Sequence, residues 1–421
     1  MSSPIWHPFT QHALIPKMTK VDRAEGAYLY TPEGKRITDA ISSWWVVTHG
    51  HCHPALVEAA REQAGKLDQV IFAGHTHNPA EQLAEELVKL APEGLSKVFY
   101  SDSGSTAVEV ALKMALGYWH NIGEAQRQKI VVMEHSYHGD TIGTMSAGER
   151  GVYNQAYSPL LFDVETIPFP TPGKEAETVQ ALEDILTDNQ DKVAAFIVEP
   201  LVLGAGGMMM YSPEVLKNLK IICEKHDVVF IADEVMTGWG RTGTMWACDQ
   251  AGIAPDIMCT SKGLTGGFMP LAVTMCQDRF FDAHYSQDRA RMFFHSSSYT
   301  ANPIACAVAY ANTGIWKDEP VQERIDTVVK HHTQHLDTLK DNPQFENLRQ
   351  CGTIAAMDIK VSDQGYLSNI APQLYDNFQA QGLLLRPLGN TVYIMPPYCV
   401  SSGDLNEIYE AITNAPKVLG L

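Results

Sequence analysis

The stretch "VVFIADEV" (residues 228–235) is a short apolar run that carries two acids near its end. It is rich in Val and Ile and apolar at consecutive positions, a pattern typical of a strand buried on both faces in a parallel sheet. Similar runs recur along the chain, separated by helical patterns: "KVFYSD" (97–102), "KIVVME" (129–134), "VAAFIVEP" (193–200) and "DIMCTSK" (256–262). We therefore predict an α/β fold with a doubly wound, mostly parallel sheet over residues 55–304.

The pattern changes after residue 304. A long polar helical pattern covers residues 321–340 and precedes two strand candidates, "GTIAAMDI" (352–359) and "NTVYIMPP" (390–397), and a final helix. We predict a smaller α+β domain over residues 305–421, joined in space by the N-terminal segment, residues 1–54.

Composition narrows the class of protein. The chain has 421 residues, 45% of them hydrophobic and 19% charged, which is typical of a globular protein with two or three subdomains. A net charge of −18 argues against a nucleic-acid or anionic-membrane surface. No apolar stretch approaches a membrane span, the N-terminus lacks a signal-peptide pattern, and the eight scattered cysteines form no CxxC. We expect a cytoplasmic enzyme with reduced thiols.

Polar residues follow several predicted strands, and the carboxyl ends of parallel strands are where such sheets bind ligands. One of them, Lys262, stands among glycines in "SKGLTGGFMPLA" (261–272). A lysine in such a loop is usually solvated. The alternative is an amine held for covalent chemistry with a carbonyl, which requires a carboxylate, an aromatic ring and a phosphate site nearby.

Asp233 is the candidate carboxylate, 29 residues before Lys262. A buried acid at a strand end needs a positive partner, and a protonated pyridine ring is such a partner. Capping of a following helix explains the same residue equally well.

The stretch "DSGSTAVEV" (102–110) is the candidate phosphate site. Gly104, Ser105 and Thr106 open a predicted helix, whose free N–H groups and positive dipole end attract an anion. An ordinary helix cap is the alternative. The triphosphate-binding pattern GxxxxGK[ST] is absent from the sequence.

The stretch "HSYHGDT" (135–141) offers Tyr137 and His138 after a strand end. A tyrosine there can stack on a flat ring or simply pack against the loop. Upstream, "THGHCHP" (48–54) places three histidines at alternating positions, but no acidic or cysteine cluster accompanies them and Pro54 suits a helix start. We predict a structural turn rather than a metal site.

Taken together, these motifs resemble the class III aminotransferases of the fold-type I pyridoxal phosphate family. The resemblance covers nearly the whole chain: "GHCHP", "SDSGSTAVEVALK", "YHGDT", "IVEP", "IADEVMTGWGRTG", "SKGLTGG" and "TANPIACA". It implies that Lys262 bonds the cofactor and moves the proton, that Asp233 pairs with the pyridine nitrogen, and that Tyr137 stacks on the ring. It also implies that Gly104 and Ser105 hold the phosphate.

The same resemblance implies a homodimer whose site lies at the interface. Ser297 and Ser298 of one subunit would then reach the phosphate bound by the other. The family often has Gly-Pro-Thr where this chain has Ser296, Ser297 and Ser298, so the hydroxyl persists as Ser298 while the contour that binds the amino donor differs.

Three further stretches resemble a branch of the family that acts on 8-amino-7-oxononanoate in biotin biosynthesis: "IWHPFT" (5–10), "SSWWVVTHG" (42–50) and "LRPLGNTVYIMPPY" (385–398). Trp44 and Trp45 suit an apolar chain, and Arg386 suits a carboxylate. Phe9 replaces a tyrosine common in that branch, so a hydroxyl is lost from this substrate-binding position. The expected donor is S-adenosyl-L-methionine, with lysine as the alternative.

Two other functions remain open. One is a class III ω-amino-acid or diamine transaminase with a similar frame. The other is a non-catalytic α/β protein that binds a phosphorylated ligand, although the presence of both Lys262 and Asp233 argues against it.

Overall fold

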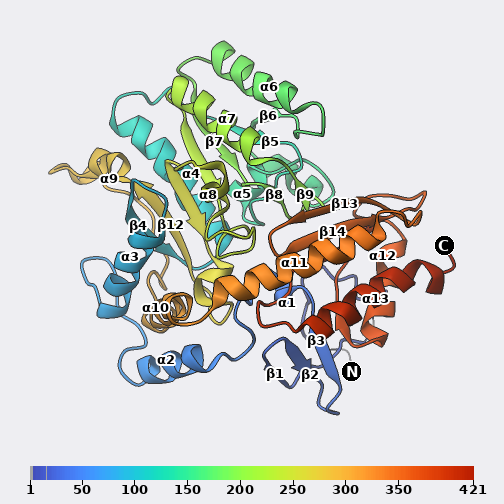
Figure 1. Cartoon of the computed structure of the whole chain (residues 1–421). Helices are drawn as coiled ribbons and strands as arrows, with labels where there is room; N and C mark the ends of the chain where they lie inside the picture. Colours follow the sequence, from blue (N-terminus) through green and yellow to red (C-terminus); the bar gives the residue numbers. More distant parts are fainter. Residues whose placement is uncertain (1–2, 16) are drawn as a thin grey trace.

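The computed structural model describes residues 3–15 and 17–421; residues 1, 2 and 16 of the expected N-terminal segment lie outside the described residues. A seven-stranded sheet forms the centre of the molecule, in the order β4-β12-β11-β10-β7-β5-β6 (Figure 1). Its strands are β4 (Leu95–Ser101), β5 (Lys129–Met133), β6 (Glu165–Ile167), β7 (Val193–Val198), β10 (Val229–Asp233), β11 (Ile257–Thr260) and β12 (Ala272–Gln277). The prediction of a mostly parallel sheet is confirmed.

The exception is β12, which the sequence analysis did not predict. It pairs antiparallel with β11 on one side and with β4 on the other. Only the segment between Thr260 and Ala272 connects β11 to β12. A parallel crossover needs a dozen residues or more, usually with a helix, so this short connection returns the chain antiparallel. The connection contains Lys262, which the reversal holds at the sheet edge.

Both faces of the sheet are buried, which explains the continuous apolar runs. On β5, Val131 and Met133 pack with helices α6 (Glu175–Asp188) and α7 (Pro213–Lys225). The alternate residues Ile130 and Val132 pack with α4 (Gly104–Asn121) and with Phe280 of α9 (Asp278–His284). At the β4 end, α3 (Asn78–Leu90) and α10 (Pro303–Asp318) cover the sheet.

The two ends of the chain meet in a second region (Figure 1). Strands β1 (Arg23–Glu25), β2 (Tyr28–Tyr30) and β3 (Arg36–Asp39) form a sheet with β15 (Leu383–Leu384), which runs parallel to β3. A third sheet contains β13 (Phe345–Cys351), β14 (Ile354–Ile359) and β16 (Thr391–Ile394), and the helices beside it are α11 (Val321–Leu339), α12 (Ile370–Ala380) and α13 (Ser402–Val418). The expected contact between the N-terminal segment and the C-terminal region is therefore present.

Short elements complete the fold. They are α1 (Ser42–Trp45), α2 (Pro54–Ala64), α5 (Ile142–Ser146), α8 (Ala247–Ala251), the two-stranded β8 (Val202–Leu203) and β9 (Met209–Met210), and the 3₁₀ turns η1 (Gln155–Leu160), η2 (Lys262–Thr265) and η3 (Arg289–Arg291). Pro54 opens α2, as the sequence predicted. No helix within the described ranges has the length and apolar character needed to cross a membrane.

Candidate active site

A cavity of about 420 Å³ lies where β10 and β11 end and α4 begins. Its walls come from three parts of the chain: the region of the seven-stranded sheet, the N-terminal segment and the C-terminal region. It brings together nine of the residues predicted from the sequence: Phe9, Trp44, Trp45, Gly104, Ser105, Tyr137, Asp233, Lys262 and Arg386. Asp233 and Lys262, which stand at the ends of neighbouring strands, therefore lie in one cavity at the edge of the sheet.

Lys262 stands at the start of η2, and its amine extends into the cavity. Nζ lies 4.9 Å from the centroid of the Trp45 ring. Burial lowers the pKa of this amine from 10.5 to about 8, although the nearby charges of Asp233 and Glu199 oppose the fall. The amine therefore reaches its neutral, nucleophilic form at lower pH than an ordinary lysine does.

Asp233 ends β10 and is almost fully buried. Its Oδ2 lies 2.7 Å from Nδ1 of His138, and its Oδ1 accepts a hydrogen bond from the Val235 N–H at 3.1 Å. The helix-cap alternative is wrong, because the chain after Asp233 runs through turns and the next helix, α8, begins only at Ala247. The carboxylate is instead held by an imidazole at the edge of the cavity.

The first turn of α4 faces the same cavity. Ser103 caps this helix, since its hydroxyl accepts from the Thr106 N–H while the Thr106 hydroxyl accepts from the Ser103 N–H. Gly104 permits close packing, because a Cβ there would lie 2.6 Å from Cγ1 of Val235. The cap and the anion-binding interpretations are compatible: Ser103 supplies the cap, and Gly104 and Ser105 line the cavity.

Glu199 ends the apolar run "VAAFIVEP" (193–200) and received no role from the sequence. It lines the cavity and accepts hydrogen bonds from the Tyr137 N–H at 2.9 Å and the Gly204 N–H at 3.1 Å. Burial raises the pKa of its carboxyl to about 7. These bonds fix the loop that carries Tyr137, so the strand-end position was the signal that could have identified this residue.

The cavity mouth is built by residues from both ends of the chain. Arg386 donates a hydrogen bond to the Phe9 carbonyl at 2.8 Å, and its guanidinium carbon lies 5.4 Å from the Trp44 ring centroid. Trp44 is 43% exposed, whereas Trp45 is buried and donates its indole N–H to the Tyr393 hydroxyl at 2.9 Å. Of the tandem pair, Trp44 alone offers an open face at the mouth.

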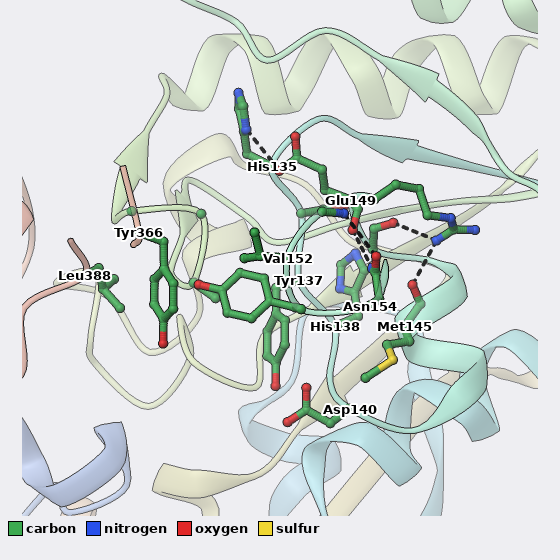
Figure 2. Close-up of a pocket in the computed structure, with 18 of the residues that line it drawn as sticks. His135, Tyr137, His138, Asp140, Met145, Glu149, Val152, Asn154, Tyr366 and Leu388 are labelled. Atoms are coloured by element: carbon green, nitrogen blue, oxygen red, sulfur yellow. Dashed lines mark hydrogen bonds and ion pairs between the residues drawn. The ribbon is translucent and has the colours of Figure 1, made fainter. Parts of the chain in front are cut away.

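A second cavity of about 310 Å³ adjoins the first and shares Tyr137, Asp140 and Tyr366 with it (Figure 2). Figure 2 shows the Tyr137 hydroxyl directed toward Asp140. The rings of Tyr153 and Tyr366 meet at 4.8 Å between centroids and join a loop of the large sheet region to the C-terminal region. Neither tyrosine was predicted, because nothing in a loop sequence indicates which distant loop it contacts.

The remaining predicted residues lie elsewhere. Ser296, Ser297 and Ser298 do not line the cavity of their own chain, and the Ser297 hydroxyl bonds Asp102. Their contact with a second subunit stays a prediction.

The three histidines of residues 48–54 have separate surroundings. His51 contacts Asp39 at 2.8 Å, His53 contacts Glu319 at 3.1 Å, and His49 is buried. Within residues 3–15 and 17–421, no group of three or more His, Cys, Asp or Glu side chains is arranged to hold a metal ion.

Comparisons with known proteins identify the family of the chain. The family model described as "Aminotransferase class-III" matches residues 10–415. The chain has the fold-type I architecture and belongs to the class III aminotransferase family.

Individual relatives cover nearly the whole chain. The adenosylmethionine-8-amino-7-oxononanoate aminotransferase of Synechococcus elongatus is 46% identical over 419 residues, 97% of each protein. The crystal structure of the enzyme of that name from Methanocaldococcus jannaschii has a TM-score of 0.94 and 32% identity, covering 98% of this chain and 97% of that one. An amine transaminase from an uncultivated Pseudomonas species, solved in a PLP-bound form, has a TM-score of 0.92 and 30% identity, covering 99% and 98%.

Proposed function

We propose that the cavity binds pyridoxal 5'-phosphate and that the protein transfers an amino group from S-adenosyl-L-methionine to 8-amino-7-oxononanoate, forming 7,8-diaminononanoate in biotin biosynthesis. The single observation that carries the proposal is the grouping of Lys262, the Asp233–His138 pair and the α4 N-terminus around one cavity, with Arg386 and Trp44 at its mouth. Relatives with this activity in their names, up to 46% identical, support the choice of substrates.

The residues present fit this cofactor. Gly104 and Ser105 place the first turn of α4 at the cavity, where free N–H groups suit an anion, and the buried Asp233 carboxylate is suited to a protonated ring nitrogen. Tyr137 lines the same cavity and offers a ring for stacking. When bound, the cofactor supplies an aldehyde that combines with amines and a pyridine ring that accepts electrons from the bond being broken.

The chain's own residues carry out the remaining tasks. Lys262, with its lowered pKa, is the group that holds and releases the cofactor and moves the substrate α-proton. Asp233 keeps the ring nitrogen protonated, and His138 orients Asp233 through the 2.7 Å contact. Glu199 holds the loop of Tyr137 in place. Trp45 and Tyr393 close the cavity beside Lys262 and reduce the access of water.

The residues at the cavity mouth select the substrates. Arg386 is half-buried, and its fork can bind a carboxylate, which both 8-amino-7-oxononanoate and an amino-acid donor possess. Trp44 and Phe9 offer apolar faces to the chain of the oxo acid, and their rings lie 5.7 Å apart. An ω-amino-acid or diamine transaminase is the second candidate, supported by the TM-score of 0.92 to the amine transaminase structure.

Separate half-reactions test the proposal. The protein loaded with cofactor is mixed in turn with S-adenosyl-L-methionine, lysine and simple ω-amines, and the near-visible absorbance of the cofactor is followed. We expect bleaching by S-adenosyl-L-methionine and recovery on addition of 8-amino-7-oxononanoate. If lysine bleaches the cofactor and S-adenosyl-L-methionine does not, lysine is the amino donor. Bleaching by simple amines with no recovery by the oxo acid would favour the ω-transaminase.

We further propose a homodimer in which Ser298 and Ser297 of each subunit complete the phosphate site of the other. Mixed dimers test this arrangement. Lys262→Ala and Ser298→Ala each damage a different part of the site, so a dimer with one of each contains one intact site if the sites are shared. Activity should rise when the two inactive or weakened variants are unfolded and refolded together, and absence of any rise would argue for sites made within one chain.

The same proposal covers domain organisation and location. We propose a large domain of residues 55–304, with a small domain formed by residues 1–54 and 305–421; the pairing of β15 with β3 supports this division. We also propose a cytoplasmic location, which the eight free cysteines support.

A further inference from the structure

The turn that carries Lys262 has an unusual backbone. Lys262 itself has a φ of +47°, in the left-handed region that L-residues rarely adopt, and Gly266 and Gly267 follow with +64° and +84°. A non-glycine residue persists in that region only when surrounding contacts hold it there. Contacts around the turn must therefore fix the direction of the Lys262 amine.

Packing restrains one side of the turn. A Cβ at Gly263 would lie 2.6 Å from Cβ of Trp239, and one at Gly267 would lie 2.6 Å from the Val46 carbonyl carbon. The turn therefore sits directly against neighbouring backbone and side chains. Packing of this kind limits how far the turn can move, but it does not set the orientation of the peptide planes.

Asn312 supplies that orientation from the other side. It lies on α10, which packs against α2 and α3 (Figure 1), and its side chain is completely buried. Its Nδ2 donates hydrogen bonds to the carbonyls of Gly263 at 3.0 Å and Leu264 at 3.1 Å. These are the carbonyls of the two residues that follow Lys262, whereas the Lys262 carbonyl itself accepts a hydrogen bond from the Gly267 N–H at 3.2 Å. Asn312 does not line the cavity, so any effect on the site passes through the turn.

The amide can serve the turn in only one orientation. Its NH₂ group must face the two carbonyls, which leaves Oδ1 on the side of His49. Burial lowers the pKa of His49 to about 3, and the Asn312 side chain partly opposes this fall. His49 is therefore neutral near pH 7, and it places no charge beside the amide.

We propose that Asn312 is a positioning residue for the reaction. Its two hydrogen bonds hold the carbonyls of Gly263 and Leu264, and thereby fix the turn that aims the Lys262 amine into the cavity. The inference rests on the proposed function only in that Lys262 must bond the cofactor; it does not depend on which amines the enzyme uses.

The experiment compares three variants with the unmodified protein. Asn312→Asp keeps the shape of the side chain but replaces the NH₂ group by oxygen, and Asn312→Ala removes both polar groups. Thr313→Val is the matched control on the same helix: it is also nearly isosteric, and it removes only a 2.7 Å hydrogen bond to the Tyr310 carbonyl. Each cofactor-free protein is mixed with pyridoxal phosphate, the near-visible absorbance is followed, and borohydride reduction with peptide mapping quantifies the bond to Lys262.

We expect bond formation to slow by roughly 10- to 100-fold in both Asn312 variants, the scale expected for a misplacement near 1 Å. We also expect the pH midpoint of the near-visible absorbance to shift in these variants and to stay unchanged in Thr313→Val. Thermal unfolding of each protein accompanies the measurement, because a purely structural role would change the melting temperature without moving the spectral midpoint.

Three results would overturn the inference. The first is bond formation at the unmodified rate in either folded Asn312 variant. The second is an equal slowing in Thr313→Val. The third is failure of both Asn312 variants to fold, which would make Asn312 a core residue only. If the unmodified protein fails to capture the cofactor, the proposed function falls and this inference falls with it, so the two failures are distinguishable.

Discussion

The lowered pKa of Lys262 leads to a quantitative prediction about pH. An amine with a pKa of about 8 is neutral in about one molecule in ten at pH 7, whereas the ordinary value of 10.5 leaves about three in ten thousand neutral. Since only the neutral amine attacks the cofactor aldehyde, Lys262 should react roughly 300-fold faster at pH 7 than an ordinary lysine of equal access. The rate should rise about tenfold per pH unit below pH 8 and level off above it.

The assay uses cofactor-free protein across pH 6–10. The initial rate of near-visible absorbance change is measured after addition of pyridoxal phosphate, and the reduced product is mapped by mass spectrometry. Lys220 is the internal control, because it is also buried but lies 3.2 Å from both Asp256 and Glu224, which hold its amine. Modification should therefore occur at Lys262 and not at Lys220.

The variant Asp233→Asn tests the direction in which the charge of Asp233 shifts the pKa of Lys262. The charge of Asp233 raises the pKa of Lys262, so its removal should shift the midpoint of the pH profile downward. A profile that continues to rise toward pH 10 in the unmodified protein would refute the reasoning, because Lys262 would then be an ordinary solvated lysine. A midpoint that moves upward in Asp233→Asn would refute the assigned charge interaction.

Four variants test the roles assigned to individual residues. Lys262→Ala should fold yet lose transamination by several orders of magnitude, measured by steady-state kinetics; near-normal turnover would contradict its role. Asp233→Asn should slow α-proton removal, measured with an α-deuterated donor. It should also weaken cofactor retention, because a charge-assisted hydrogen bond worth about 1.5–3 kcal/mol is lost. Full activity with an unaltered cofactor spectrum would contradict this role. Arg386→Ala should weaken the binding of substrates that carry a carboxylate and leave the binding of simple amines unchanged; equal losses for all amines would make Arg386 structural. Trp44→Ala should weaken the binding of oxo acids by up to about 0.8 kcal/mol per buried methylene, measured over a series of chain lengths.

The sheet and the position of polar residues at its edge could be predicted because local sequence determines them. The runs around residues 129–134 and 228–235 are apolar on both faces, and β5 and β10 formed within them. Polar residues at strand ends gather at one edge as a consequence of parallel pairing, so the placement of Lys262 and Asp233 needed no tertiary information. Their chemical roles follow from the family resemblance and stay predictions.

The contacts that hold these residues could not be predicted in the same way. The partner of Asp233 is His138, 95 positions away, and that of the Lys262 turn is Asn312, 48 positions beyond Leu264. A histidine or an asparagine in a loop or helix pattern has no sequence feature that identifies a distant partner. Strand β12 was missed for a related reason: its direction follows from the short connection after β11, which the apolar pattern alone does not describe.

The fold alone does not distinguish the substrates of this family. The structure matches both an oxononanoate aminotransferase and an amine transaminase with TM-scores of 0.94 and 0.92, each over nearly the whole chain. Specificity must therefore arise from side chains on a shared backbone. The residues proposed for this role belong to segments from opposite ends of the chain, since the carbonyl of Phe9 accepts from Arg386 while its ring contacts Trp44. Because Phe9 and Arg386 both contact Trp44, the effects of substitutions at these three positions should not simply add, and they should be tested in combination.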